Sequence, residues 1–146
     1  MLRTAAAITL ALVVITPVGS AQSAADSAAI RATALDYIEG WYTGDAARME
    51  RALHPDLAKR IVRTDQDGVS SLSHMTAGQL VTATESGYGK QTPVDERQKE
   101  VTILDVYRGA AVVKIVARDW IDYLQIGRFD GRWVIINVLW ELKAQP

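Results

Sequence analysis

The chain has the length of one domain, 146 residues, and a hydrophobic fraction of 49% that is sufficient for a single buried core. Its 16 basic and 17 acidic residues are mixed along the sequence, so no polyanion-binding surface for nucleic acid is expected. The lack of cysteine excludes disulfides, thiolate nucleophiles and thiolate metal ligands.

Residues 1–21 have the order of features that is typical of a secretion signal. Arg3 precedes an apolar run over residues 5–15, and a string of small residues follows. The run is shorter than the roughly 20 residues that a membrane-spanning helix needs. We therefore expect cleavage after Ala21 or Ser23. The mature chain is then exported to a periplasm or out of the cell, with no membrane attachment.

Residues 26–146 of the mature chain are expected to form one domain that begins with helices. Gly44 can end the first helix in a left-handed conformation, and Asp45 can cap a short second helix. The apolar positions of the first helix have the spacing of one buried stripe: Ile30, Ala34, Tyr37, Ile38 and Trp41.

Turn signals follow the second helix. Pro55 disfavours helical geometry in the residue before it, so this helix should stop with His54 at a bend. Residues 57–61 are expected to add at most one helical turn. The pattern over residues 62–74 predicts a small hairpin around the Asp67-Gly68 turn.

A third helix and a sheet complete the expected fold. Thr76 and Gln79 form a capping box, which starts a helix at Ala77, and a glycine-rich loop over residues 87–93 follows it. Three or four antiparallel strands are then expected, over residues 99–107, 110–118, 120–129 and 132–141. The fold class is therefore α+β, with N-terminal helices packed on an antiparallel sheet.

Both faces of the last expected strand are apolar. Alternation places Trp133, Ile135 and Leu139 on one face, and the opposite face receives Val134, Ile136, Val138 and Trp140. Helices can cover only one of these faces, so the other needs a second cover. We expect a homodimer through the sheet; an unusually apolar exposed face is the alternative.

The expected order of elements, helices followed by a strongly curved antiparallel sheet, is that of the cone-shaped nuclear transport factor 2-like fold. The chain resembles the putative lumazine-binding branch of that superfamily in four segments: residues 37–45, 52–60, 122–124 and 131–141. This resemblance implies a conical pocket between the helices and the concave sheet, and frequently a dimer through the sheet. It implies no particular reaction, because the superfamily includes isomerases, dehydratases, epoxide hydrolases, polyketide cyclases and proteins that only bind.

The candidate catalytic residues are His54, Asp122 and Tyr123. His54 can act as a base near neutral pH, or it can fix the helix corner through a backbone hydrogen bond. Asp122 and Asp119 flank Trp120, which can raise a carboxylate pKa by desolvation, although such acids are often solvated turn residues. The resemblance implies a histidine at the position of Gln125, and if that histidine takes part in chemistry in the family, this difference counts against catalysis here.

The remaining candidates are ligand-binding residues. Tyr123, Gln125 and Asn137 lie among apolar residues of expected strands, so at least one should enter the pocket; Asn137 can instead bond to backbone at a bulge. Tyr37 and Trp41 either line the pocket or belong to the core. With only two histidines and no phosphate loop or nucleophile elbow, we expect no metal and no cofactor.

Three functions remain open at this stage. The first is an exported domain that encloses a small apolar or aromatic molecule, oriented by His54, Asn137, Tyr123 and Gln125. The second is a cofactor-free isomerase, dehydratase or cyclase with His54 or Asp122 as general base and Tyr123 as hydrogen-bond donor. The third is a structural homodimeric interaction module with a filled core.

Overall fold

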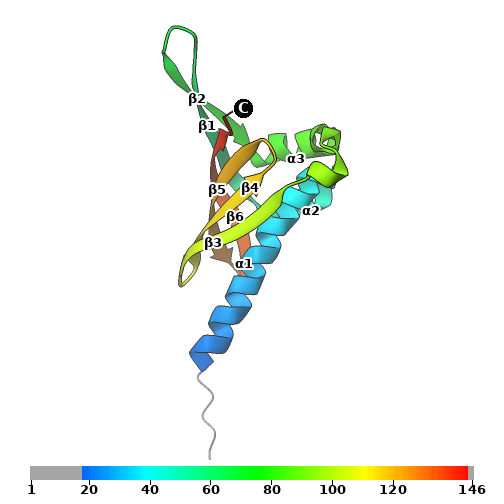
Figure 1. Ribbon diagram of the computed structural model, residues 1–146. Helices are drawn as coiled ribbons and strands as arrows, with labels where there is room; N and C mark the ends of the chain where they lie inside the picture. Colours follow the sequence, from blue (N-terminus) through cyan, green and yellow to red (C-terminus); the bar gives the residue numbers. More distant parts are fainter. Residues whose placement is uncertain (1–17, 145–146) are drawn as a thin grey trace, which may run out of the picture.

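The computed structural model describes residues 18–144, and it describes the side chains from residue 23 onward. The helices and strands of this part follow one another in the order that Figure 1 shows. They are α1 (Val18–Thr43), α2 (Ala46–Ala52), β1 (Leu53–Thr64), β2 (Ser70–Thr76), α3 (Ala77–Glu85), the 3-10 helices η1 (Tyr88–Gln91) and η2 (Val94–Glu96), β3 (Lys99–Tyr107), β4 (Ala110–Ala117), β5 (Trp120–Phe129) and β6 (Arg132–Leu142).

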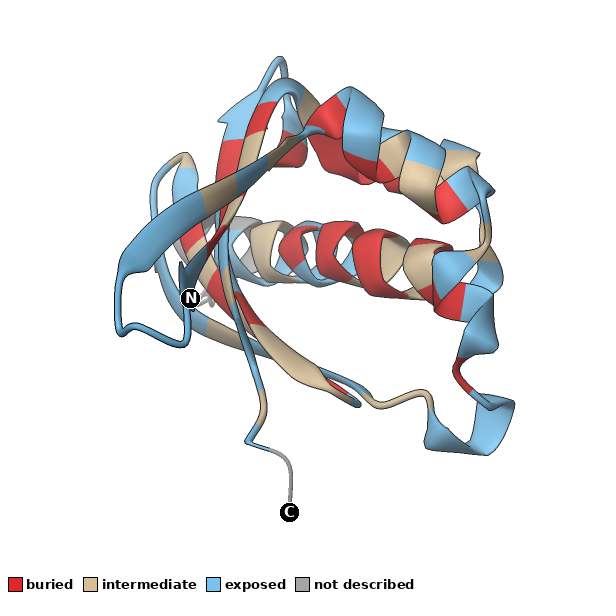
Figure 2. Cartoon of the chain, turned by 90° about the horizontal axis from the view of Figure 1, so that it is seen from above, coloured by how far each residue is buried: buried red, intermediate tan, exposed pale blue. Residues whose placement is uncertain are grey.

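The strands form one sheet with the order β2-β1-β6-β5-β4-β3. The sheet curves around α1, and α2 and α3 lie at one end of it (Figure 2). Strands β3 to β6 pair in antiparallel hairpins, as expected. Strand β1 pairs in parallel with β6, so the sheet is mixed and the expectation of a wholly antiparallel sheet is corrected. The α+β class and the cone of helices on a curved sheet are confirmed.

The expected helix ends are confirmed. Gly44 has a φ of 69°, in the left-handed region, and the Asp45 side chain accepts a hydrogen bond from the backbone N–H of Arg48 at 3.0 Å. Thr76 and Gln79 form the capping box of α3. The expected secretion signal falls mainly on residues 1–17, outside the described part. It stays a prediction that N-terminal sequencing of the mature chain would check.

Residues 57–61 form part of strand β1, so the expected helical turn is wrong. Leu57 and Ile61 are buried on one face of this strand, with alternation of period two. The backbone hydrogen-bonding groups of β1 find partners in β2 on one side and β6 on the other. The hairpin turn at Asp67-Gly68 is confirmed, because β1 and β2 pair across it and Gly68 has a φ of 80°.

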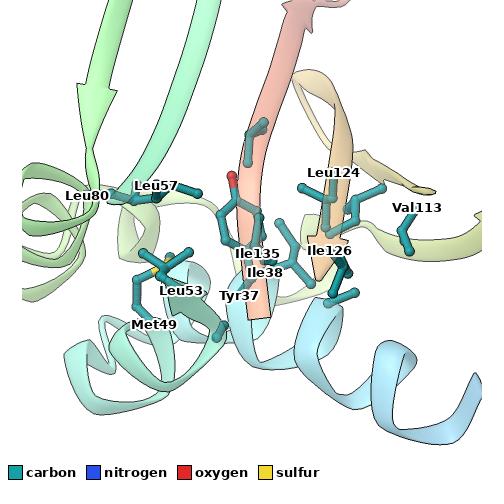
Figure 3. Close-up of a cluster of buried hydrophobic side chains, with 14 of the residues drawn as sticks. Tyr37, Ile38, Met49, Leu53, Leu57, Leu80, Val113, Leu124, Ile126 and Ile135 are labelled. Atoms are coloured by element: carbon teal, nitrogen blue, oxygen red, sulfur yellow. The ribbon is translucent and has the colours of Figure 1, made fainter. Parts of the chain in front are cut away.

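The core lies between α1 and the concave face of the sheet. Figure 3 shows Ile38 of α1 close to Ile126 and Ile135, and Met49 of α2 close to Leu53 of β1. Ion pairs outside this core join the same elements, since Arg48 of α2 bonds to Asp36 and Glu39 of α1. Apolar packing therefore positions α1 over the sheet, and the ion pairs hold α2 against α1.

Strand β6 contains a bulge that changes which residues face the core. Gln125 pairs with Asn137, whereas Ile126 pairs with Ile135, so Ile136 is an extra residue. After the bulge, Val138 points into the core and Leu139 is 54% exposed. The expected grouping of Leu139 with Trp133 and Ile135 is wrong, because strict alternation does not survive an inserted residue.

The glycine-rich segment after α3 packs tightly against α1. Gly89 of η1 is buried, and a Cβ atom at this position would overlap the backbone carbonyl of Trp41. This segment was expected to be a loop, and its close approach requires a residue with no side chain. Gly89 therefore helps to position Trp41.

Replacing Gly89 by alanine is predicted to destabilise the fold by about 1–3 kcal/mol, because η1 must move away from α1. Urea unfolding followed by circular dichroism measures the change. Gly78→Ala is the matched control: a Cβ at this α3 position meets nothing within 4 Å, and alanine favours a helix. Equal stability of the Gly89→Ala protein and the wild type would contradict the close packing.

Candidate functional site

A cavity of about 270 Å³ lies between the helices and the concave face of the sheet. We call it the cone pocket. Its walls are mainly aromatic and apolar, and two basic side chains also reach it. The lining residues are Tyr37, Trp41, Met49, Lys59, Arg63, Met75, Leu80, Trp120 and Trp140.

Lys59 of β1 is the polar centre of the cone pocket. Its Nζ donates hydrogen bonds to Asp122 Oδ1 at 2.6 Å and to the Tyr37 hydroxyl at 2.7 Å. The second oxygen of Asp122, Oδ2, accepts a hydrogen bond from the Trp120 indole at 2.6 Å. Side chains from α1, β1 and β5 thus meet at one ammonium group.

These polar groups are held away from water. Asp122 is fully buried and Lys59 is 9% exposed. Burial lowers the pKa of Lys59, and the negative charge of Asp122 opposes this change. Burial raises the pKa of Tyr37 well above its usual value, and Asp122 adds to that rise. Tyr37 is therefore a neutral phenol at physiological pH and carries a proton next to the amine.

Aromatic rings surround this polar centre. The Lys59 ammonium lies 4.8 Å from the centre of the Trp140 ring, within the range of a cation–π interaction. Trp41 and Trp120 meet edge to face, with ring centres 6.4 Å apart. A planar molecule in the pocket would contact aromatic rings and the hydrogen-bond donors of Lys59 and Arg63.

The candidate residues predicted from sequence do not share one pocket. Tyr37 and Trp41 line the cone pocket. Tyr123, Gln125 and Asn137 line a shallow concavity of about 520 Å³ that excludes the cone-pocket residues. The reason is strand alternation: Asp122 and Leu124 point into the core, so Tyr123 points outward and is 42% exposed. Their expected placement with Tyr37 and Trp41 is wrong.

His54 lies in a third place, an open groove bounded by α2, α3 and the end of β5. Its Nδ1 accepts a hydrogen bond from the backbone N–H of Asp56 at 3.1 Å, and its ring packs on Phe129 with centres 4.5 Å apart. Of the two roles considered for His54, this geometry matches the one that fixes the backbone. The corner is the start of strand β1 rather than a helix end.

Asp122 and Asn137 also have well-defined partners. Both oxygens of Asp122 accept strong hydrogen bonds, so a general base at this position would first have to lose a partner. The Asn137 amide donates to the Gln125 side chain at 3.0 Å, next to the β6 bulge. Asp119 is half exposed at the turn before β5 and lies 3.8 Å from Arg118, which fits the solvated alternative.

Sequence reasoning missed Lys59. Its signal is the alternation of Leu57, Lys59 and Ile61, which places a lysine on the apolar face of a strand. The assignment of these residues to a helical turn concealed that signal, because a helix does not put positions two apart on one face. A lysine on a buried strand face requires a partner, and that partner is Asp122.

Among residues 18–144, no group of three or more histidine, cysteine or acidic side chains is placed to hold a metal ion. No helix in this part of the chain combines the length and the apolar character needed to cross a membrane.

Comparison with solved structures defines the class of the protein: it has a nuclear transport factor 2-like fold. One similar structure is a protein of unknown function from Shewanella baltica OS155, with a TM-score of 0.64 and 15% identity, covering 84% of this chain and 97% of that one. Another, from Silicibacter pomeroyi DSS-3, has a TM-score of 0.61 and 16% identity, covering 83% and 98% of the two chains. At such identities the likeness concerns the fold alone.

The family model described as putative lumazine-binding matches residues 25–141, which is most of the chain. The protein therefore belongs to this family. No curated protein matches the sequence.

The buried ion pair predicts strong coupling between Lys59 and Asp122. Lys59→Met leaves a buried carboxylate without its cation and should cost about 3–5 kcal/mol of unfolding free energy. Adding Asp122→Asn removes the stranded charge. The double variant should therefore lose less unfolding free energy than the two single variants lose together. Urea unfolding at neutral pH measures all three proteins.

The control for this cycle is Lys114→Met, because Lys114 pairs with Tyr123 on the outward-pointing side of β4. It should change stability by less than about 0.5 kcal/mol. If Lys59→Met costs no more than Lys114→Met, or if the two single effects simply add, the ion pair is not coupled as we describe.

Proposed function

We propose that the protein binds a small, planar, largely apolar molecule in the cone pocket, with an electronegative atom of the ligand facing Lys59. The observation that carries this proposal is the enclosure of one buried ammonium by the walls of Trp41, Trp120 and Trp140. Apolar walls with a few well-placed polar groups are the usual composition of a small-molecule site.

The size of the cone pocket favours a compact ligand. Its volume of about 270 Å³ is just below the roughly 300 Å³ at which pockets for drug-sized molecules begin. Molecules with one or two fused rings are therefore better candidates than steroids or large polyketides. Met49 and Met75 add flexible, polarisable walls, which can adapt to rings of different outline.

Binding is supported better than the acid/base reaction considered from the sequence. That reaction needs a base and a hydrogen-bond donor in one site, but His54 and Tyr123 line two other concavities. Asp122 lies beside the cone pocket with both oxygens engaged. These three residues do not form one catalytic group in this geometry.

A thermal-shift screen of the mature domain tests the proposed binding. The panel contains pterins, lumazine-type pteridines, flavins, steroids and small aromatic acids. A ligand at one hundred times its dissociation constant should add about 2.7 kcal/mol of stability. Quenching of tryptophan fluorescence should accompany a hit, since three tryptophans line the pocket.

Two variants locate the binding site. Lys59→Arg keeps the charge but moves the donors, and it should weaken binding of a hit that has an electronegative atom. His54→Ala lies in the separate groove and should leave the affinity unchanged. Loss of binding in His54→Ala with retention in Lys59→Arg would place the ligand elsewhere.

We also infer a homodimer through the outward face of the sheet. Exposed Tyr123 and Leu139 lie opposite each other on β5 and β6, and the Gln125–Asn137 pair lies beside them. Amide side chains have both donors and an acceptor, so this pair can bond to its own copy across a two-fold axis. The exposed aromatic and aliphatic surface supplies the apolar contact.

Sedimentation of the mature protein at tens of micromolar tests the dimer, and the wild type is expected to sediment as one. Leu139→Glu should shift it to the monomer, because a charge in the centre of an apolar contact is costly. Val94→Glu on η2 is an exposed control away from this face and should not change the mass. A monomeric wild type would remove the basis for the dimer.

A further inference from the structure

We propose that Lys59 reacts reversibly with an aldehyde or ketone in the cone pocket and holds it as a protonated imine. This inference rests on the proposed function, because the same cavity must first admit the ligand. The geometry points to it: a primary amine in an aromatic cavity contacts both a carboxylate and a phenol, at 2.6 and 2.7 Å.

An amine that adds to a carbonyl group needs a base to accept its proton and an acid to protonate the oxygen. Asp122 is placed to accept a proton from Lys59, since its Oδ1 lies on the Nζ atom. Tyr37 keeps its hydroxyl proton, because burial and the charge of Asp122 raise its pKa. Its oxygen also lies within hydrogen-bond distance of the same Nζ atom.

The reaction balances without any further reactant. The ammonium of Lys59 transfers one proton to Asp122, and the nitrogen lone pair forms a bond to the carbonyl carbon. The carbonyl π electrons move to oxygen, which receives a proton from Tyr37. The nitrogen then gives its second proton to the Tyr37 phenolate. Asp122 returns its proton to the hydroxyl group, the nitrogen lone pair expels that group as the C–O bond breaks, and the oxygen leaves as water. The product is an iminium ion, with Asp122 restored as its carboxylate counter-ion and Tyr37 as a phenol.

The surroundings of Lys59 favour imine formation at this residue over imine formation at other lysines. Burial lowers its pKa, although Asp122 opposes the change, and a desolvated lysine is the usual form of an imine-forming residue. Lys99 is half exposed and bonded to Glu39, and Lys143 bonds to Gln98. Lys59, by contrast, lines the mainly apolar cone pocket.

The cavity walls define the class of carbonyl compound. Trp140 covers the ammonium on one side, so an iminium formed there remains next to an aromatic ring. A conjugated carbonyl group on one planar ring matches both the volume of about 270 Å³ and the tryptophan walls. Aromatic aldehydes are the class that we infer, and benzaldehyde is the simplest probe.

Reductive trapping tests the proposal. The full mature protein is incubated with benzaldehyde at neutral pH, sodium cyanoborohydride is added, and peptide mass mapping locates the benzyl-amine adduct. We expect Lys59 to be labelled at least about tenfold faster than any other lysine. Benzyl alcohol, which has the same ring but no carbonyl group, should raise the melting temperature without labelling.

Three variants separate the imine from simple binding. Lys59→Arg keeps a cation beside Asp122 but cannot form an imine, so it should show no adduct at this position. Tyr37→Phe keeps the ring, and it should slow labelling of Lys59 while benzyl alcohol still binds. Lys114→Met removes a lysine on the other side of the sheet and should leave the rate at Lys59 unchanged.

Absence of an adduct at Lys59, or labelling no faster than at exposed lysines, overturns the imine proposal. If benzyl alcohol still raises the melting temperature in that case, the binding function stands. If neither benzyl alcohol nor benzaldehyde changes the melting temperature and no adduct forms, the result counts against both proposals. Equal labelling rates in Tyr37→Phe and the wild type would remove the proton-donor role and contradict the reaction as written.

Discussion

The hydrogen-bonded ion pair between Lys59 and Asp122 is the contact on which the arrangement of the pocket depends. The two residues lie on β1 and β5, which are separated in the sheet by β6, so the pair spans a strand. Tyr37 joins α1 to the same ammonium. Such a buried pair gains little net stability, because desolvation offsets the attraction, but the loss of either partner is costly. It therefore acts mainly to specify where β1 and α1 lie relative to β5.

The same pair determines which chemistry the pocket can support. Because Lys59 and Trp120 occupy both oxygens of Asp122, the carboxylate can exchange a proton with Lys59 but is not free to take one directly from a ligand. The group that remains directed at the cavity is an amine among aromatic rings. Ligands with electronegative atoms, and carbonyl compounds in particular, fit that environment. Ligands that need a free carboxylate do not.

Local signals in the sequence predicted the local structure well. The caps at Asp45 and Thr76, and the turn at Gly68, depend on neighbouring residues and were confirmed. The parallel pairing of β1 with β6 joins distant segments, and nothing near residues 57–61 indicates it. The site was missed for the same reason, since Lys59 acquires its role only when β1 enters the sheet beside β6. The candidates Tyr37 and Trp41 do line the pocket, because they belong to the apolar stripe of α1 and that stripe faces the sheet.

The bulge at Ile136 shows how one residue decides the character of the pocket. Before it, Trp133 and Ile135 face the core; after it, Val138 faces the core and Trp140 reaches the cone pocket. With regular alternation, Asn137 and Leu139 would follow Ile135 on that side. The amide would then take the place of Val138, and a leucine would stand where the Trp140 ring now covers Lys59. The ammonium would then lose its aromatic neighbour, and the outward face would gain that ring. An insertion in one strand thus decides whether an aromatic ring or an aliphatic side chain covers the amine of Lys59, so the fold alone does not determine the ligand.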